Sequence, residues 1–303
     1  MSDSTAVASS APAASNGWMS RRGYTWRETG LAFGFLAPSL IVFVAFFYAP
    51  FFKLLNWGRF KAVKGGQSYT DAGLQQYRDV LTGKDFTDGL WHSVQFVLWT
   101  VPFGLLFGTL LAVAAHRRLR GIKVFQAIFS STLASSVAVS SVIFFFLLNP
   151  VVGAIKGWDP IASPRWSIFA AALPSIWQNL GLAFVIVLAG LQAIPDEVIE
   201  ASMLDGYSPF RRLIKITLPL ISPVLLFLFV ILVIFGFQAF AQIEIITRGG
   251  PAGSSETLVF KIFQETQNYG KGAVMSVGLF LITLVVTFLQ FAILERRVHY
   301  GDS

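Results

Sequence analysis

Residues 194–223 read IPDEVIEASMLDGYSPFRRLIKITLPLISP, and this polar stretch separates two long apolar runs. The pattern predicts two short amphipathic helices joined by a sharp turn. Asp196 can cap the first helix, and Gly206 supplies the left-handed backbone position after its last turn. Ser208, followed directly by a proline, is expected to cap the second helix, and Pro219 to end it.

Two kinds of side chain lie around the first of these helices. Val198, Ala201 and Leu204 recur at helical spacing on one face, whereas Glu197 and Glu200 lie on another. The helix can therefore present apolar and acidic groups to a cytoplasmic partner, or it can lie as an ordinary interfacial helix on the membrane surface.

The composition indicates a membrane protein. The chain of 303 residues is 54% hydrophobic and 13% charged, against roughly 45–50% and 25% in soluble domains. Six apolar runs each approach the roughly 20 residues that a helix needs to cross the hydrocarbon core. A backbone that faces lipid must satisfy its own hydrogen bonds, so we expect an all-α integral membrane protein with six transmembrane helices. The runs cover residues 30–52, 89–115, 124–148, 167–194, 220–242 and 274–294.

The two ends of the chain differ from this apolar region. Residues 1–28 are rich in Ala and Ser and contain no apolar run, which predicts a disordered cytoplasmic tail. The first apolar run is a retained span, because it is longer than the core of a signal peptide. We therefore expect a six-helix transmembrane domain over 29–298, which contains the loop 195–219, and a short tail over 299–303.

The orientation follows from positive charges beside the spans. The shortest loop carries four basic residues within a few positions, and two arginines directly follow the last run. Short loops rich in Lys and Arg stay in the cytoplasm, so both termini of this multi-pass cell-membrane (inner or plasma membrane) protein are expected there. The net charge of +7 fits anionic lipid headgroups, and no basic run is long enough for a nucleic-acid partner. The basic residues are Arg117, Arg118, Arg120, Lys123, Arg296 and Arg297.

Several kinds of chemistry have no support in the sequence. It contains no Cys, and none of the predicted spans carries the central charged residue that a proton relay requires. It also contains no Gly-x-x-x-x-Gly-Lys-Ser/Thr loop to hold ATP. His92, His116 and His299 lie at span ends or in loops. We therefore expect no catalytic residue, no metal site and no cofactor in this chain.

Uncharged polar residues do occur within the apolar runs. Besides Ser and Thr residues between 130 and 141, they include the amides Gln178, Asn179, Gln238 and Gln242. Such side chains commonly pack helices against one another, and they can also line a path for a polar solute. Both interpretations stay open, and the four amides are the candidates for a substrate path.

The segment quoted first resembles the membrane permease subunits of ATP-binding-cassette importers for carbohydrates, the binding-protein-dependent type. Their signature is Glu-Ala-Ala, three residues, Gly, nine residues, then Ile, one residue and Leu-Pro. In this chain a Ser replaces the second Ala, and the other fixed positions match. The signature positions hold Glu200, Ala201, Ser202, Gly206, Ile216, Leu218 and Pro219.

Other segments extend this resemblance over nearly the whole chain after residue 30. Residues 188–192 look like part of the family's fourth span, and residues 247–257 look like its extracytoplasmic segment before the last span. Residues 258–263 and 295–300 look most like the first permease subunit of the importers for glycerol-3-phosphate and glycerophosphodiesters.

The resemblance implies a division of labour among subunits. Two homologous permease subunits pair, a dimer of ATPase subunits binds ATP and Mg on their cytoplasmic side, and an extracytoplasmic solute-binding protein delivers the solute. The first short helix would sit in a cleft of an ATPase subunit and move with it, which produces alternating access. This chain would then be no enzyme. The implied coupling residues are Glu197, Glu200, Ala201, Ser202, Leu204, Asp205 and Gly206.

The implied function is half of the translocation path for a polar carbohydrate-type solute, with glycerol-3-phosphate or a glycerophosphodiester favoured. A phosphate prefers Arg or Lys as donors, yet only Arg248 lies near an outer mouth. Polyols and sugars suit the amides equally well. The alternatives are a permease for a di- or oligosaccharide such as maltose or trehalose, an ATP-independent secondary transporter, and a membrane enzyme. A secondary transporter predicts internal repeats, and none is convincing in this sequence.

Overall fold

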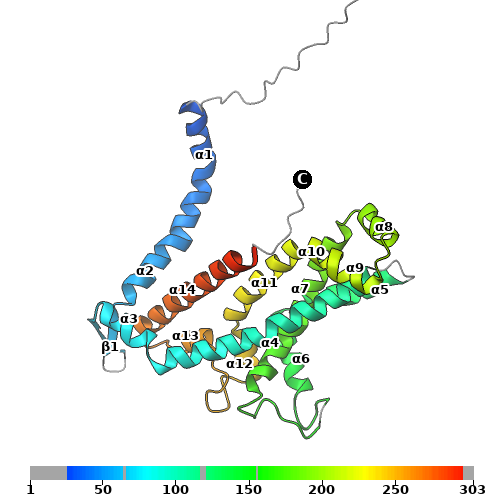
Figure 1. Ribbon diagram of the computed structural model, residues 1–303. Coiled ribbons are helices and arrows are strands. Elements are labelled where there is room, and N and C mark those ends of the chain that lie inside the picture. Colours follow the sequence, from blue (N-terminus) through cyan, green and yellow to red (C-terminus); the bar gives the residue numbers. More distant parts are fainter. Residues whose placement is uncertain (1–25, 64–65, 117–120, 155, 296–303) are drawn as a thin grey trace, which may run out of the picture. The chain divides into compact units, whose positions relative to one another are not determined.

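The computed structural model describes residues 26–63, 66–116, 121–154 and 156–295, and these are mostly helical (Figure 1). The tail predicted at 299–303 and most of the tail predicted at 1–28 lie outside the described residues. Several basic residues and one histidine named above lie outside them too. They are Arg117, Arg118, Arg120, Arg296, Arg297 and His299.

An N-terminal unit that ends at Phe52 contains the whole of the first predicted span, residues 30–52. The helices α1 (Trp26–Phe43), η1 (Val44–Tyr48, a π-helix) and α2 (Ala49–Trp57) follow one another directly. Together they are long and apolar enough to cross a membrane, and their large apolar side chains are exposed. The helix predicted over 30–52 is therefore present.

The second unit begins at Lys53 and contains a small β-hairpin soon afterwards. The strands β1 (Phe60–Val63) and β2 (Ser68–Asp71) pair antiparallel. This hairpin corrects the prediction of an all-α chain. A search for apolar spans of about 20 residues cannot detect strands of four residues.

The helix α3 (Leu74–Leu81) is fixed to the hairpin and to α2 by two side chains. The Gln76 amide donates from Nε2 to the carbonyl oxygen of Phe60 at 2.8 Å, and the Tyr77 hydroxyl donates to the carbonyl oxygen of Leu55 at 2.6 Å. Burial raises the pKa of the Tyr77 phenol above its usual value. These bonds hold the end of α2, the hairpin and α3 together.

The second unit is built around two long helices that run side by side, α4 (Lys84–Ala115) and α7 (Ser167–Gln192) (Figure 1). Small residues let their backbones approach closely. A Cβ atom added to Gly108 would lie 2.5 Å from the Cβ of Ala183. Lipid offers helices no hydrophobic drive to associate, so close van der Waals packing at such small residues holds membrane helices together.

The third apolar run is not one helix, which corrects the prediction for 124–148. Its first part, α5 with the 3-10 turn η2, covers Ile122–Ala134, and its second part is α6 (Val137–Leu147). The two parts meet at an angle of 103°. Ser136 has an extended backbone at this bend, and its hydroxyl accepts a hydrogen bond from the Val139 N–H at 3.2 Å, so it caps α6.

The fifth run, predicted at 220–242, is also broken. A helical stretch over Pro209–Leu220 meets α11 (Ser222–Phe237) at 69°, and the chain breaks again before α12 (Ala241–Ile246). The other helices of this region and of the C-terminal part are α8 (Asp196–Leu204), α9 (Pro209–Arg212), η3 (Leu213–Thr217), α10 (Leu218–Leu220), α13 (Leu258–Gln264) and α14 (Tyr269–Leu294).

Within the described part of the chain, four helices are long and apolar enough to cross a membrane. Each bent pair can serve as one further span, which gives up to six by length and composition. The chain is therefore a multi-spanning helical membrane protein, in which two of the six predicted spans are bent helix pairs.

The packing of α4 on α7 makes a prediction about stability. In Gly108→Ala the new methyl group would lie 2.5 Å from the Ala183 Cβ and 2.8 Å from the Leu180 carbonyl oxygen, so the backbones must separate. We expect a loss of about 1–3 kcal/mol in the free energy of unfolding, measured in mixed micelles. Gly34→Ala is the control, because a Cβ there meets nothing within 4 Å. Equal stability of the two variants would contradict this packing.

Candidate functional site: a neutral pocket and an exposed turn

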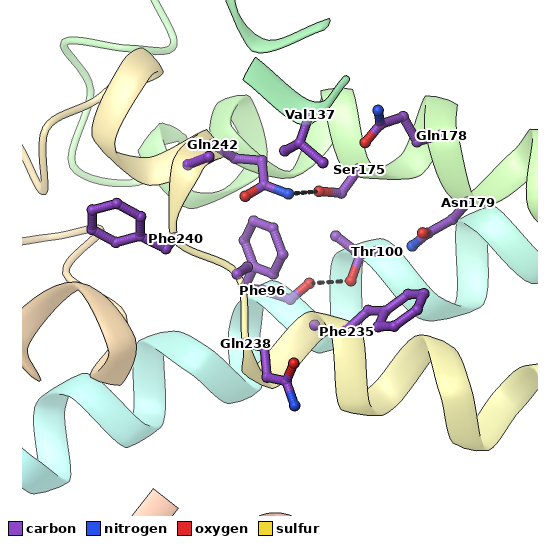
Figure 2. A pocket seen from close by; sticks show the side chains of 13 residues that line it. Phe96, Thr100, Val137, Ser175, Gln178, Asn179, Phe235, Gln238, Phe240 and Gln242 are labelled. Atoms are coloured by element: carbon purple, nitrogen blue, oxygen red, sulfur yellow. Dashed lines mark hydrogen bonds between the residues drawn. The ribbon is translucent and has the colours of Figure 1, made fainter. Parts of the chain in front are cut away.

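A pocket of about 460 Å³ lies between α4, α6, α7 and the junction of α11 with α12 (Figure 2). The four amides singled out from the sequence all line it, although they come from two separate apolar runs. The structure thus brings together Gln178, Asn179, Gln238 and Gln242. Their role in a substrate path stays a prediction.

The helix α7 supplies three polar residues to this pocket at helical spacing. Ser175, Gln178 and Asn179 lie on one face of α7, because residues three or four positions apart are neighbours on a helix. The Gln178 amide donates from Nε2 to the carbonyl oxygen of Ser135 at 2.9 Å. Ser135 lies at the bend between η2 and α6, so the bend supplies an acceptor that a continuous helix would use internally.

The most buried amide of the pocket is Gln242, which is 8% exposed. Its Nε2 donates to the Ser175 hydroxyl at 2.8 Å, and this bond joins α12 to α7 (Figure 2). On α4, the Thr100 hydroxyl donates to the carbonyl oxygen of Phe96 at 2.9 Å. The donor groups at this wall are therefore held in place by the protein itself.

The break between α11 and α12 accounts for the position of Gln238. This residue ends α11, and its N–H donates to the carbonyl oxygens of Ile234 and Phe235, both at 3.2 Å. Gln238 also borders a second cavity of about 710 Å³, which α14 lines along much of its length. The amides at 238 and 242 thus reach the central pocket from either side of a helix break.

The central pocket carries no formal charge. Its described lining contains amides, hydroxyls and the aromatic rings of Phe96, Phe235 and Phe240, and no Asp, Glu, Lys, Arg or His. An apolar wall with a few fixed donors and acceptors suits a small polar molecule with hydroxyl groups. Ser175 and Thr100 were not predicted from the sequence as lining residues. Ser175 precedes Gln178 by three residues, and this helical spacing could have identified Ser175 as a lining residue. No local pattern in the sequence marks Thr100.

The turn after α8 has the geometry that the sequence predicted for Gly206. Its φ of +76° is left-handed. The Gly206 N–H donates to the carbonyl oxygen of Met203 at 3.1 Å, and the Tyr207 N–H donates to that of Ser202 at 3.1 Å. These two bonds form a Schellman motif, which closes the C-terminal end of α8.

The second short helix begins as predicted, and two other expectations need correction. Ser208 caps α9 by accepting a hydrogen bond from the Arg211 N–H at 3.4 Å. Asp196 is not the cap of α8, because Pro195 holds that position and Asp196 lies in the first turn. Pro219 does not end the second helix, which continues to Leu220. The π-helix η3 precedes Pro219 and relaxes the hydrogen-bond ladder where a proline cannot donate.

The exposed side of α8 carries both kinds of predicted side chain. Leu204 is 89% exposed, and Ala201 is exposed on the same helix. The carboxylates of Glu197, Glu200 and Asp205 are exposed as well. The structure therefore places six of the seven predicted coupling residues on a surface that is open to a partner.

Ser202 is the exception among these residues, since it faces the interior. It is 3% exposed, and its hydroxyl donates to the carbonyl oxygen of Ile199 at 2.6 Å. Ser202 and the Ala that the signature has at this position are both small, which fits the buried face of α8.

The burial of Ser202 predicts how a larger side chain at this position changes the local stability of α8. Ser202→Leu places a larger side chain on the buried face, whereas Ala201→Leu, the matched control, places it on the exposed face. We expect amide hydrogen exchange over 196–207 to be about tenfold faster in Ser202→Leu, because overpacking lowers the free energy of local opening by roughly 1–3 kcal/mol. The prediction fails if both variants exchange at the same rate.

The described residues contain no group of three or more His, Asp or Glu side chains that could hold a metal ion. The His92 Nδ1 atom lies 3.1 Å from the carbonyl oxygen of Glu256, and His116 follows the end of α4. Neither histidine lines the central pocket.

Comparisons with known proteins agree with this architecture. The family described as "Binding-protein-dependent transport system inner membrane component" matches residues 80–300. The sn-glycerol-3-phosphate transport system permease protein UgpA of Agrobacterium fabrum (strain C58) is 31% identical over 88% of this chain and 95% of its own length. The protein of the same name from Escherichia coli (strain UTI89) is 31% identical over 93% of this chain and 100% of its own.

Solved structures share the fold at lower identity. A chain in the crystal structure of a bacterial alginate ABC transporter, in complex with an alginate pentasaccharide-bound periplasmic protein, has a TM-score of 0.76. It is 18% identical, and the match covers 91% of this chain and 98% of that one. A chain of an amino acid ABC transporter matches with a TM-score of 0.50 over 74% of this chain and 96% of its own, at 16% identity.

Proposed function

This chain belongs to the inner membrane components of binding-protein-dependent transport systems, and we propose that its neutral pocket is half of a translocation path. It is a permease subunit of an ATP-binding-cassette importer of the sugar-transporting type, and it is not an enzyme. The observation that carries the proposal is the meeting of four amides from separate apolar runs at one uncharged pocket.

The proposed solute is glycerol-3-phosphate, which the names of the relatives give, or a glycerophosphodiester. In this chain the amides of Gln178, Asn179, Gln238 and Gln242 would bind the glycerol hydroxyls. Because the described lining holds no cation, the phosphate would be met by groups outside this pocket, such as those of the second permease subunit. The second candidate, an uncharged saccharide such as maltose or trehalose, is favoured by that same lack of charge.

The remaining partners follow the same proposal. A homologous permease subunit completes the path, a dimer of ATPase subunits binds ATP and Mg, and an extracytoplasmic protein delivers the solute. Six transmembrane spans arise when each bent pair crosses the membrane once, with both termini and α8 in the cytoplasm. The loop 195–219 is then the coupling loop, and the transporter works by alternating access.

The pocket predicts the effect of removing its amides. In the complex reconstituted with its partners, each of Gln178→Leu and Gln242→Leu should lower the apparent affinity for solute about fivefold, since a hydrogen bond contributes about 1 kcal/mol. The measurement is ATP-dependent uptake of glycerol-3-phosphate, a glycerophosphodiester, maltose and trehalose into proteoliposomes. Gln75→Leu is the control, because this amide is exposed on α3. Unchanged uptake of all four solutes in both variants would overturn the proposed path.

The proposed coupling makes a separate prediction at Gly206. Gly206→Val places a branched residue in a left-handed turn at a cost on the order of 1–2 kcal/mol. Gly157→Val is a matched control, since Gly157 has φ +80° and Gly206 has φ +76°, and a Cβ at either meets nothing within 4 Å. We expect solute-stimulated ATP hydrolysis and co-purification of the ATPase to fall severalfold only in Gly206→Val, while membrane insertion is unchanged. Equal behaviour of the two variants would exclude α8 as the coupling element.

A further inference from the structure

A smaller pocket lies at the hairpin. The hairpin and α8 lie toward opposite ends of α4 (Figure 1). It has a volume of about 290 Å³, and four of its five lining residues are aromatic. Trp57 comes from α2, Phe60 and Tyr69 come from the two strands, and Tyr269 begins α14. Gly270 completes the lining. The pocket shares no residue with the central pocket.

The strand register brings two of these rings to one face. Phe60 pairs with Asp71 and Ala62 pairs with Tyr69, so the side chains of these four residues project from the same side of the hairpin. The Tyr69 hydroxyl donates to the carbonyl oxygen of Gln267 at 3.4 Å, just before α14. This bond holds the ring of β2 across the segment that carries Tyr269.

Gly270 allows the hairpin to approach α14 closely. A Cβ atom at this position would overlap the carbonyl oxygen of Phe60. The same carbonyl oxygen accepts the 2.8 Å hydrogen bond from Gln76, whose side chain is buried. The backbone that supports the rings is thus fixed from α3 and from α14, while the rings of Trp57 and Tyr269 remain open to a ligand.

Aromatic rings that surround a small pocket favour a particular chemistry. The face of each ring carries negative charge density, so several faces together attract a cation and disfavour an anion. A primary ammonium group needs hydrogen-bond acceptors, and the phenol oxygens of two tyrosines are the side-chain acceptors in this lining. A quaternary ammonium group needs none, because its methyl groups contact the rings directly.

The charges near the pocket do not oppose a cation. On the hairpin, Asp71 shares the face of the rings and forms an ion pair with Arg59, with 2.8 Å between Oδ2 and Nη2. On α14, the Lys271 Nζ atom lies 2.6 Å from Asp85 Oδ2 and 2.5 Å from Glu265 Oε1. The positive charges of Arg59 and Lys271 are therefore balanced by carboxylates.

We propose that the pocket formed by Trp57, Phe60, Tyr69 and Tyr269 binds a quaternary ammonium group of the choline type. This group occurs both on lipid headgroups and on small soluble molecules. The chemistry of recognition is the same for the two sources, and the site acts independently of the solute path at the centre of the chain.

The test compares choline with 3,3-dimethylbutan-1-ol, which has the same shape without the charge. The full-length chain, in complex with its partners, is placed in nanodiscs of anionic lipid that lacks choline. Labelled choline should bind saturably, and the neutral alcohol should compete at least tenfold more weakly than unlabelled choline. Equal competition by the alcohol would overturn the proposal, because it would show that the pocket binds the apolar shape of the ligand and does not recognise its charge. Absence of saturable choline binding would overturn it as well.

Variants then assign the binding to these rings. Trp57→Leu should lower the affinity for choline about tenfold, and Trp57→Phe, which keeps a ring, should lower it less. Trp91→Leu is the matched control, because Trp91 on α4 is 57% exposed and lies outside the pocket, against 52% for Trp57. Thermal stability, measured in parallel, separates a lost ligand from a lost fold. Choline affinity unchanged in a stable Trp57→Leu variant would contradict the proposed site.

The source of the group is resolved by displacement. If phosphatidylcholine added to the nanodisc displaces labelled choline and soluble phosphocholine does not, the ligand is a lipid headgroup. The reverse result assigns a soluble ligand. Failure of both to displace choline would show that the pocket does not accept this group on a larger molecule, and would overturn the proposal.

Discussion

The close packing of α4 against α7 is the contact on which the rest of the second unit depends. Gly104 and Gly108 leave no side chain between the two backbones, so α7 residues pack directly onto α4. A Cβ at Gly104 would lie 2.6 Å from the Cβ of Asn179, one of the amides of the central pocket. The separation of these two helices therefore sets the width of the pocket, whose walls include Thr100 on α4 and Ser175 on α7.

The breaks in the apolar runs supply polar groups to the pocket beside this helix pair. A continuous helix in lipid uses its carbonyl groups internally, and irregular backbone at membrane depth is tolerated where it is enclosed by protein or lines a cavity. Two of the breaks described above, the bend before α6 and the interruption between α11 and α12, border the central pocket. One break presents the Ser135 carbonyl to Gln178, and the other places Gln238 and Gln242 on either side of an interruption. The interruptions thus place polar groups at the cavity, where irregular backbone is tolerated.

The sequence could predict what depends on local chemistry. Gly206 and Ser208 take the conformations expected of a left-handed turn and a helix cap, because these preferences are set by one or two residues. Apolar runs located four helices near their observed positions. The amides of the pocket could be chosen as polar exceptions inside apolar runs.

The bends and the hairpin could not be predicted from hydropathy, which reports how apolar a run is and not where it turns. Leu133 and Val137 on either side of the first bend are as apolar as their neighbours, and the bend depends on an extended backbone at Ser135 and Ser136. The hydrogen-bond partners within the pocket could not be predicted either, since the Gln242–Ser175 bond joins residues 67 positions apart. Contacts of this kind depend on how helices pack, and one sequence does not encode them in any local pattern.

The position of α8 in the chain gives a physical route from its exposed surface to the pocket. α7 ends at Gln192, four positions before α8 begins, and α8 leads through α9, η3 and α10 into α11. Gln178 on α7 and Gln238 at the end of α11 both line the pocket. The Schellman turn at Gly206 closes the C-terminal end of α8, and Ser202 is buried on its inner face. In the proposed coupling, a force applied to α8 would act on both polar walls of the pocket through the backbone of α7 on one side and of α9, η3, α10 and α11 on the other.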